Sequence, residues 1–156
     1  SLLATADSGI KRIADAGGKR IAVIRGTTTE NALTTALAKA KLKAEVIQVD
    51  NREQGFAMLA DARVDAFASD RFLLMNALAS LRSAKPLRLM DEDFSVEPYA
   101  LALPRDDAKF RLAVNRSLAE VFRSGEIARV YERWLGQFGQ PSLLLSALYY
   151  LQQVPE

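Results

Sequence analysis

The clearest structural signal in this chain is the stretch IAVIRGTTTE at residues 21–30. Its apolar and largely β-branched start predicts a strand that is buried on both faces of a parallel sheet. Thr27 and Glu30 have the T-x-x-E spacing of a capping box, which opens an amphipathic helix. The stretch therefore predicts a strand that ends at Gly26 and passes directly into a helix.

The same alternation continues along the chain. We expect further strands at residues 44–49, 64–68 and 87–90, and helices at residues 52–62 and 72–81. Strands that alternate with helices of about ten residues indicate right-handed βαβ units. The predicted fold class is therefore α/β, with a mostly parallel sheet flanked by helices.

Three more helices are expected outside this alternation. A short one at residues 9–16 ends at the glycine pair Gly17-Gly18, and two longer ones occupy residues 107–123 and 126–137. The longest apolar run, at residues 143–151, has about half of the roughly 20 residues that span a bilayer, so no transmembrane segment is expected.

Composition excludes several classes of function. The 156 residues include 21 Lys and Arg against 19 Asp and Glu, a net charge of +2, and neither His nor Cys. Without His and Cys there is no Ser-His-Asp triad, no Cys nucleophile and no zinc site of the usual kind. Dispersed charges of both signs argue against a nucleic-acid partner. We expect no metal and no cofactor.

The length predicts a single domain, and no signal peptide is expected within a chain that opens at Ser1 without a basic segment.

Two candidate binding positions lie where predicted strands end, which is where open α/β sheets bind ligands. After the first strand, the helix N-terminus at residues 26–30 offers backbone amides, a positive dipole end and three hydroxyls to a carboxylate or phosphate. The alternative is that Thr27 only caps the helix while Thr28 and Thr29 are solvated.

Asp70 is the second candidate position. It follows the apolar strand that ends in Ala68-Ser69 and could accept a ligand ammonium group. The alternative is that Asp70 only caps the next helix. Together, a carboxylate-binding loop and an ammonium-binding acid match the two charged groups of a free α-amino acid.

Several stretches in collinear order resemble the family 3 periplasmic solute-binding proteins, the amino-acid receptors of ABC importers. They are DSGIK at residues 7–11, GKRIAV at 18–23, GTTTE at 26–30, RVDAFASD at 63–70, YALAL at 99–103 and RWLG at 133–136. The resemblance runs from about residue 1 to residue 136 and covers only the later part of that family's chain.

The resemblance implies a periplasmic-binding-protein-like (type II) organisation, in which two α/β lobes are joined by two crossover strands. Its parts would be a crossover strand at 1–6, the second lobe at 7–92, a returning crossover strand at 97–103, helices at 104–137 that normally pack on the first lobe, and a tail at 138–156. Most of the first lobe is missing. We expect the tail to form an apolar helix that covers exposed surface.

The resemblance also assigns roles to residues. Thr28 and Thr29 match positions that contact the ligand carboxylate, Gly26 and Thr27 complete that loop, and Asp70 matches the acid that binds the α-ammonium group.

Arg52 falls where the glutamate/aspartate binders of this family have a His that reaches the ligand side chain. A cation there would favour an acidic ligand, and the alternative is a solvated Arg in the first turn of a helix. Glu97 and Tyr99 are weaker candidates near the returning crossover.

The function that the resemblance implies is the amino-acid-binding component of an ABC import system, acting in the periplasm with a membrane permease and without catalysis. We expect a polar or acidic amino acid as the ligand. The alternatives are a periplasmic enzyme similar to cyclohexadienyl dehydratase, or a ligand-sensing domain. For the enzyme, only Glu30, Asp70, Glu97 and Tyr99 could serve as acid or base.

We predict that the chain forms homo-oligomers, because the helices at residues 107–136 have apolar faces and lack their partner lobe. These faces contain Phe110, Leu118, Val121, Phe122, Tyr131 and Trp134. Analytical ultracentrifugation should show a sedimentation coefficient that rises with concentration. A compact monomer at every concentration would contradict the prediction.

Overall fold

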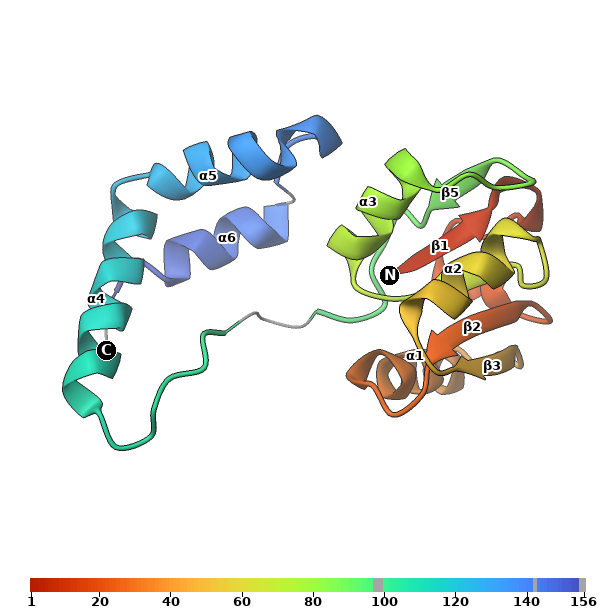
Figure 1. Cartoon of the computed structure of the whole chain (residues 1–156), viewed down its shortest axis with the longest axis horizontal. Helices are drawn as coiled ribbons and strands as arrows, with labels where there is room; N and C mark the ends of the chain where they lie inside the picture. The colour runs from red at the N-terminus through yellow and green to blue at the C-terminus, as the bar shows by residue number, and fades with distance from the viewer. Residues whose placement is uncertain (97–99, 142, 155–156) are drawn as a thin grey trace. The chain divides into compact units, whose positions relative to one another are not determined.

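The computed structural model describes residues 1–96, 100–141 and 143–154. The chain divides into two compact units, Ser1–Pro98 and Tyr99–Glu156 (Figure 1). Each unit is described by itself below.

The first unit is built on a five-stranded sheet in the order β3-β2-β4-β1-β5. The strands are β1 (Leu2–Thr5), β2 (Arg20–Ile24), β3 (Glu45–Val49), β4 (Ala66–Ala68) and β5 (Leu87–Leu89). β2 pairs in parallel with β3 and β4, whereas β1 runs antiparallel to both of its neighbours, β4 and β5. Four strands therefore point one way, which confirms the predicted α/β fold with a mostly parallel sheet.

Three helices connect these strands and cover both faces of the sheet (Figure 1). They are α1 (Thr28–Lys39), α2 (Arg52–Ala60) and α3 (Arg71–Ser80). β3 and β4 lie on opposite sides of β2, so the connections through α1 and α2 run in opposite directions. Right-handed connections in opposite directions place their helices on opposite faces. The packing agrees, because α1 covers one face while α2 and α3 cover the other.

The central strands are apolar on both faces because each face has its own hydrophobic core. On β2, Ile21 and Val23 face the core under α1, which includes Leu33 and Leu37. The residue between them, Ala22, faces the second core together with residues from β1, β4, α2 and α3: Leu3, Phe67, Leu59 and Leu74. This alternation explains why the predicted strand lacks polar residues.

The predicted helix at residues 9–16 is wrong. The structure instead has two short 3-10 turns, Ala6–Ser8 and Ile13–Ala16, separated by Gly9 with a φ of +76°. A left-handed residue interrupts the regular pattern of helical hydrogen bonds. Ile10 is nevertheless 2% exposed and packs into the core under α1, so its apolar character was a sign of burial and not of a helix.

The prediction of a strand at residues 97–103 is also not met where it can be judged. Residues 97–99, and with them the candidates Glu97 and Tyr99, lie outside the described residues, and residues 100–103 form no strand. A strand needs a hydrogen-bonded neighbour. In the described part of the chain, the last paired strand is β5, which ends at Leu89.

The second unit contains the helices α4 (Ala108–Arg123), α5 (Glu126–Leu135) and α6 (Leu143–Leu151). Its first two helices follow the prediction closely, and α6 confirms the predicted apolar helix in the tail. Among its described side chains, only Ala119 and Tyr131 are buried apolar residues. Phe122 and Tyr149 join α4 to α6, with ring centroids 5.6 Å apart.

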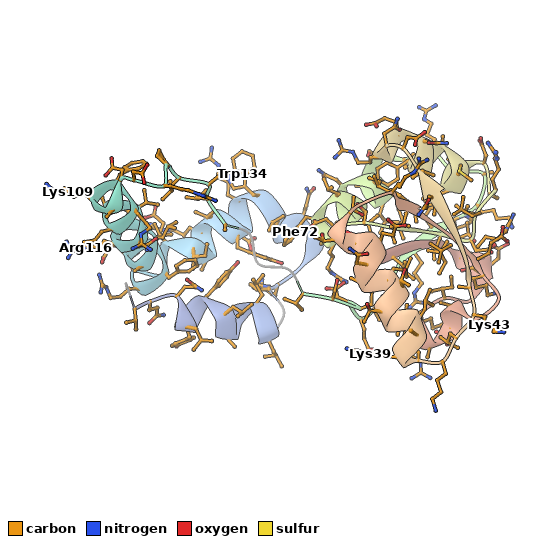
Figure 2. All side chains as sticks on the ribbon, turned by 90° about the horizontal axis from the view of Figure 1, so that it is seen from below. Lys39, Lys43, Phe72, Lys109, Arg116 and Trp134 are labelled. Atoms are coloured by element: carbon orange, nitrogen blue, oxygen red, sulfur yellow. The ribbon has the colours of Figure 1, made fainter. Side chains whose placement is uncertain are left out.

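Large apolar side chains remain exposed on this unit. Trp134 is 66% exposed, and Figure 2 shows its ring projecting from α5. Phe110 and Leu118 of α4 are also exposed. These are three of the residues on which the predicted self-association depends, and the oligomeric state stays a prediction.

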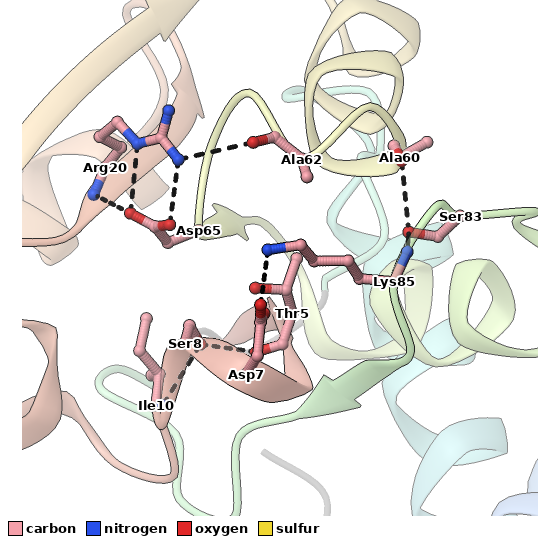
Figure 3. A network of polar contacts seen from close by, with 10 residues as sticks. All are labelled: Thr5, Asp7, Ser8, Ile10, Arg20, Ala60, Ala62, Asp65, Ser83 and Lys85. Atoms are coloured by element: carbon pink, nitrogen blue, oxygen red, sulfur yellow. Dashed lines mark hydrogen bonds and ion pairs between the residues drawn. The ribbon is translucent and has the colours of Figure 1, made fainter.

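Polar contacts at the edge where the parallel strands begin tie the connections together (Figure 3). The Asp65 carboxylate accepts hydrogen bonds from the backbone nitrogen of Arg20 at 2.8 Å and from its guanidinium at 3.1 and 3.3 Å. Burial alone would raise the pKa of Asp65, but these hydrogen bonds and the guanidinium charge outweigh it and lower the pKa. Nearby, Lys85 forms an ion pair with Asp7 at 2.5 Å.

Replacing Gly55 with alanine should destabilise the protein by about 1–3 kcal/mol, the usual cost of overpacking a core. Gly55 is buried in α2, and a Cβ atom there would lie 2.4 Å from the ring of Phe67. Urea denaturation of the Gly55→Ala variant measures the change. Gly17→Ala is a matched control, because its Cβ would lie 3.4 Å from Leu42, at ordinary contact distance. Equal stability of the two variants would contradict the prediction.

Asp65→Asn should lower the free energy of unfolding at pH 7 by about 1–3 kcal/mol, because it removes charge-assisted hydrogen bonds. A carboxyl with a lowered folded pKa adds stability above its unfolded pKa, near the ordinary 3.8, and loses it as pH falls through the folded value. The difference between Asp65→Asn and the parent should therefore shrink below about pH 4. Denaturant titrations at pH 7 and pH 3 check this, and a constant difference would contradict it.

Candidate functional site

The predicted site residues gather at the carboxyl ends of the parallel strands. β2 and β4 are neighbours, with Val23 opposite Ala68. After β2 the chain turns to the face covered by α1, and after β4 it turns to the face covered by α3. Adjacent strands whose connections leave on opposite faces form a topological switch point, where open α/β sheets bind their ligands. The fold thus brings the loop at residues 26–29 and Asp70 to the same switch point.

The first turn is held by its own backbone and side chains. Gly26 has a φ of +73°, a conformation that favours glycine. The Thr27 hydroxyl accepts a hydrogen bond from the Glu30 backbone nitrogen at 3.3 Å and donates to the Ile24 carbonyl at 2.7 Å. The predicted N-cap is confirmed. Gly26 and Thr28 are exposed, and Thr27 and Thr29 are half-buried.

Glu30 completes this turn in a way that the sequence did not predict in detail. Its carboxylate accepts a hydrogen bond from the Gly26 backbone nitrogen at 2.7 Å and another from the Gln48 side chain at 2.5 Å. Both hydrogen bonds lower the pKa of Glu30, and the bond from Gly26 has the larger effect. Because Glu30 already binds the Gly26 amide, a ligand carboxylate at this turn would meet the amides of the first helical residues instead.

Asp70 lies at the start of α3 and is half-buried. Its Oδ1 accepts a hydrogen bond from the Phe72 backbone nitrogen at 2.9 Å, so Asp70 is an N-cap. The capping role and a ligand-binding role are compatible, because a carboxylate has two oxygens with several acceptor positions. The preceding residue, Ser69, is fixed by backbone hydrogen bonds with Ser1 at 3.0 and 3.2 Å.

Arg52 begins α2 at the end of β3, on the same edge of the sheet. Its side chain is 46% exposed and lies 3.7 Å from the Glu53 carboxylate. This placement matches the solvated arginine of the alternative interpretation and leaves the guanidinium at an accessible position.

Polar residues around β3 belong to the same edge and were missed. Asn51 caps α2 by accepting a hydrogen bond from the Gln54 backbone nitrogen at 2.9 Å, and Gln54 binds the Asp50 backbone nitrogen at 2.9 Å. Arg25 forms an ion pair with Asp50 at 2.8 Å. The Asn-x-x-Gln spacing at residues 51–54 repeats the Thr-x-x-Glu spacing at residues 27–30 and would have been a usable signal.

Two concave surfaces of the first unit are lined by residues other than the predicted site residues. One is lined by residues of the connection from α3 to β5, and the other by α1 and residues 93–95. Among the described residues, no three His, Cys, Asp or Glu side chains are placed to hold a metal ion. In the same residues, no helix is both long and apolar enough to cross a membrane.

A family model described as NMT1/THI5 like matches residues 1–93. The chain is 28% identical over 136 residues to the L-glutamate/L-aspartate-binding protein of Pseudomonas aeruginosa, covering 87% of this chain and 45% of that protein. It is 27% identical over 133 residues to the glutamate/aspartate import solute-binding protein of Escherichia coli, covering 85% and 44%. The chain spans about half the length of the curated relatives that it matches.

Solved structures give the same fold. An ancestral arginine-binding protein bound to arginine matches with a TM-score of 0.66 and 27% identity, over 86% of this chain and 59% of that chain. The GluR0 ligand binding core in complex with L-glutamate matches with a TM-score of 0.69 and 25% identity, over 86% and 58%. The α/β fold is therefore that of periplasmic-binding-protein-like structures.

Proposed function

Because this chain belongs to the NMT1/THI5-like family, we propose that it is part of a solute-binding protein that delivers an amino acid to an ABC importer. The observation that supports this most directly is the switch point between β2 and β4, which brings together a helix N-terminus and the carboxylate of Asp70. These two groups complement the carboxylate and the ammonium of an α-amino acid. The names of the glutamate/aspartate-binding relatives agree with this ligand class.

Each site residue has a proposed role. Thr28 and Thr29 bind the carboxylate through backbone and hydroxyl groups, in a loop that Gly26 and Thr27 shape. Asp70 binds the ammonium group. Arg52 contacts the side chain of the ligand and favours an acidic amino acid, since its guanidinium is accessible at the same edge.

The chain as a whole is proposed to supply one lobe of a two-lobed protein. Residues 7–92 form the second lobe, and residues 1–6 and 97–103 connect it to a first lobe. The helices at 104–137 pack on that first lobe, and the apolar tail at 138–156 covers part of them. The relatives are about twice as long as this chain, which leaves room for such a lobe. The complete protein would act in the periplasm, with a membrane permease as its partner.

A ligand-sensing domain is a second candidate function. The similarity to the GluR0 ligand binding core favours this second function, because that protein has the same fold and binds the amino acid L-glutamate. Both candidates use the same site, so the binding experiments below test what they share.

The chain alone should bind amino acids at best weakly, with a dissociation constant in the millimolar range or above. Ligand affinity in a two-lobed protein depends on contacts from both lobes in the closed form. Titration with L-glutamate, L-glutamine and L-arginine, followed by NMR of backbone amides, should shift the signals of residues 26–29 and 70–72. Micromolar affinity in a monomer would contradict the two-lobed proposal, and the absence of shifts at both turns would contradict the site.

Asp70→Asn should weaken amino-acid binding about tenfold or more, because it removes a charge-assisted contact with the ammonium group. Asparagine also caps helices well, so the thermal midpoint should change little. Asp107→Asn is a matched control, because Asp107 caps α4 by accepting from the Phe110 backbone nitrogen at 2.8 Å, in the other unit. Equal effects of the two substitutions on binding would show that Asp70 acts only as a cap.

A further inference from the structure

Two neighbouring turns at the switch-point edge are built alike but differ in charge. In each, a side chain at the third helical position reaches back to the backbone nitrogen of the residue before the N-cap. Glu30 accepts from Gly26 at 2.7 Å at the start of α1, and Gln54 accepts from Asp50 at 2.9 Å at the start of α2. The side chains of Thr27 and Asn51 cap the two helices in the same manner.

The α2 turn shows that this structural role does not require a charge. The neutral amide of Gln54 makes the hydrogen bond that Glu30 makes with its carboxylate. The other partner of Glu30, the Gln48 side chain, is also neutral. The negative charge of Glu30 therefore needs an explanation other than the shape of the turn.

The charge around Glu30 nevertheless stays negative overall. The charge of Arg25 helps to lower the pKa of Glu30, but its guanidinium is paired with Asp50 at 2.8 Å, so the three groups together carry one net negative charge. In the part of the chain that the structure describes, the hydrogen-bond partners of the Glu30 carboxylate are the Gly26 amide and the Gln48 amide. Both stabilise the ionised form and lower the pKa of Glu30, so the group is charged at neutral pH.

A negative charge at this position changes which anions the turn attracts. The positive end of the α1 dipole attracts any anion, including inorganic sulfate and phosphate. The Glu30 charge opposes that attraction, and it opposes a dianion about twice as strongly as a monoanion. A carboxylate that is accompanied by an ammonium group is repelled least, because the positive charge offsets the negative one, and in the proposed binding mode the ammonium group faces Asp70.

We propose that Glu30 determines the charge selectivity of the loop at residues 26–29, disfavouring multiply charged anions so that the carboxylate of a zwitterion is preferred. This inference rests on the proposed function, since it concerns the same loop. Glu30 is accordingly a specificity-determining residue that acts beside the ligand position, not a further ligand contact.

The experiment compares sulfate binding to the whole chain before and after Glu30→Gln, using sodium sulfate and sodium acetate as probes. Amide NMR signals of residues 26–29 report binding, and sodium chloride keeps the ionic strength constant because salt screens these interactions. Glu30→Gln should strengthen sulfate binding about two- to fivefold, the range expected for one charge at a helix N-terminus, and acetate binding less. Glu53→Gln is the matched control, because Glu53 is a 76% exposed acid in the first turn of α2.

A second variant separates charge from shape. Gln48→Lys retains the Glu30 carboxylate but places a cation against it, so it should strengthen sulfate binding in the same direction. A purely structural role for Glu30 would instead leave the ratio of sulfate to acetate affinity unchanged in Glu30→Gln, and that result would overturn the proposal. The sulfate series needs no amino-acid binding. If sulfate behaves as expected while no amino acid binds, the proposed function and the preference for a zwitterion fail, and only the exclusion of dianions by Glu30 stands.

Discussion

The position of β2 between two parallel neighbours is the constraint on which the rest of the first unit depends. The chain leaves β2 towards β3 and then returns across it to reach β4. Right-handed connections require these two passes to use opposite faces, so the sheet must be covered on both sides. The strands are consequently apolar on both faces, and the turns after β2 and β4 diverge at one edge. Core packing and the candidate site are two consequences of the same strand order.

The fold could be predicted wherever a regular repeat extended over several residues. The strand at residues 20–24 is recognisable because both of its faces are buried, and α1 because Thr27 and Glu30 mark its start. Residues 9–16 misled the prediction because Ile10 and Ile13 have helical spacing by coincidence, while Gly9 adopts a left-handed conformation. The place of β1 in the middle of the sheet could not be read from local sequence, since its partners are more than 60 residues away.

The candidate site was predictable in part, for a related reason. The strand-to-helix turns at residues 26–29 and at Asp70 are local signals, and parallel pairing brings their ends to one edge. The polar contacts that join one turn to the next are not local. Gln48 meets Glu30 and Arg25 meets Asp50 only because β2 and β3 pair in register, with Val23 opposite Gln48. Such contacts need the three-dimensional structure, even though the residues themselves are ordinary surface types.

The antiparallel course of β1 has a mechanical consequence. β1 begins, and β5 ends, at the edge where the candidate site lies, and a hydrogen bond of 2.9 Å joins the Met90 nitrogen to the Leu2 carbonyl. A longer chain that contained this unit would therefore be attached to it at two adjacent points. Two adjacent tethers suppress free swivelling and leave rotation about the line between them as the softest motion. Any ligand held at that edge would sit close to the axis of this rotation, where a small displacement at the ligand corresponds to a large one at the far side of the unit.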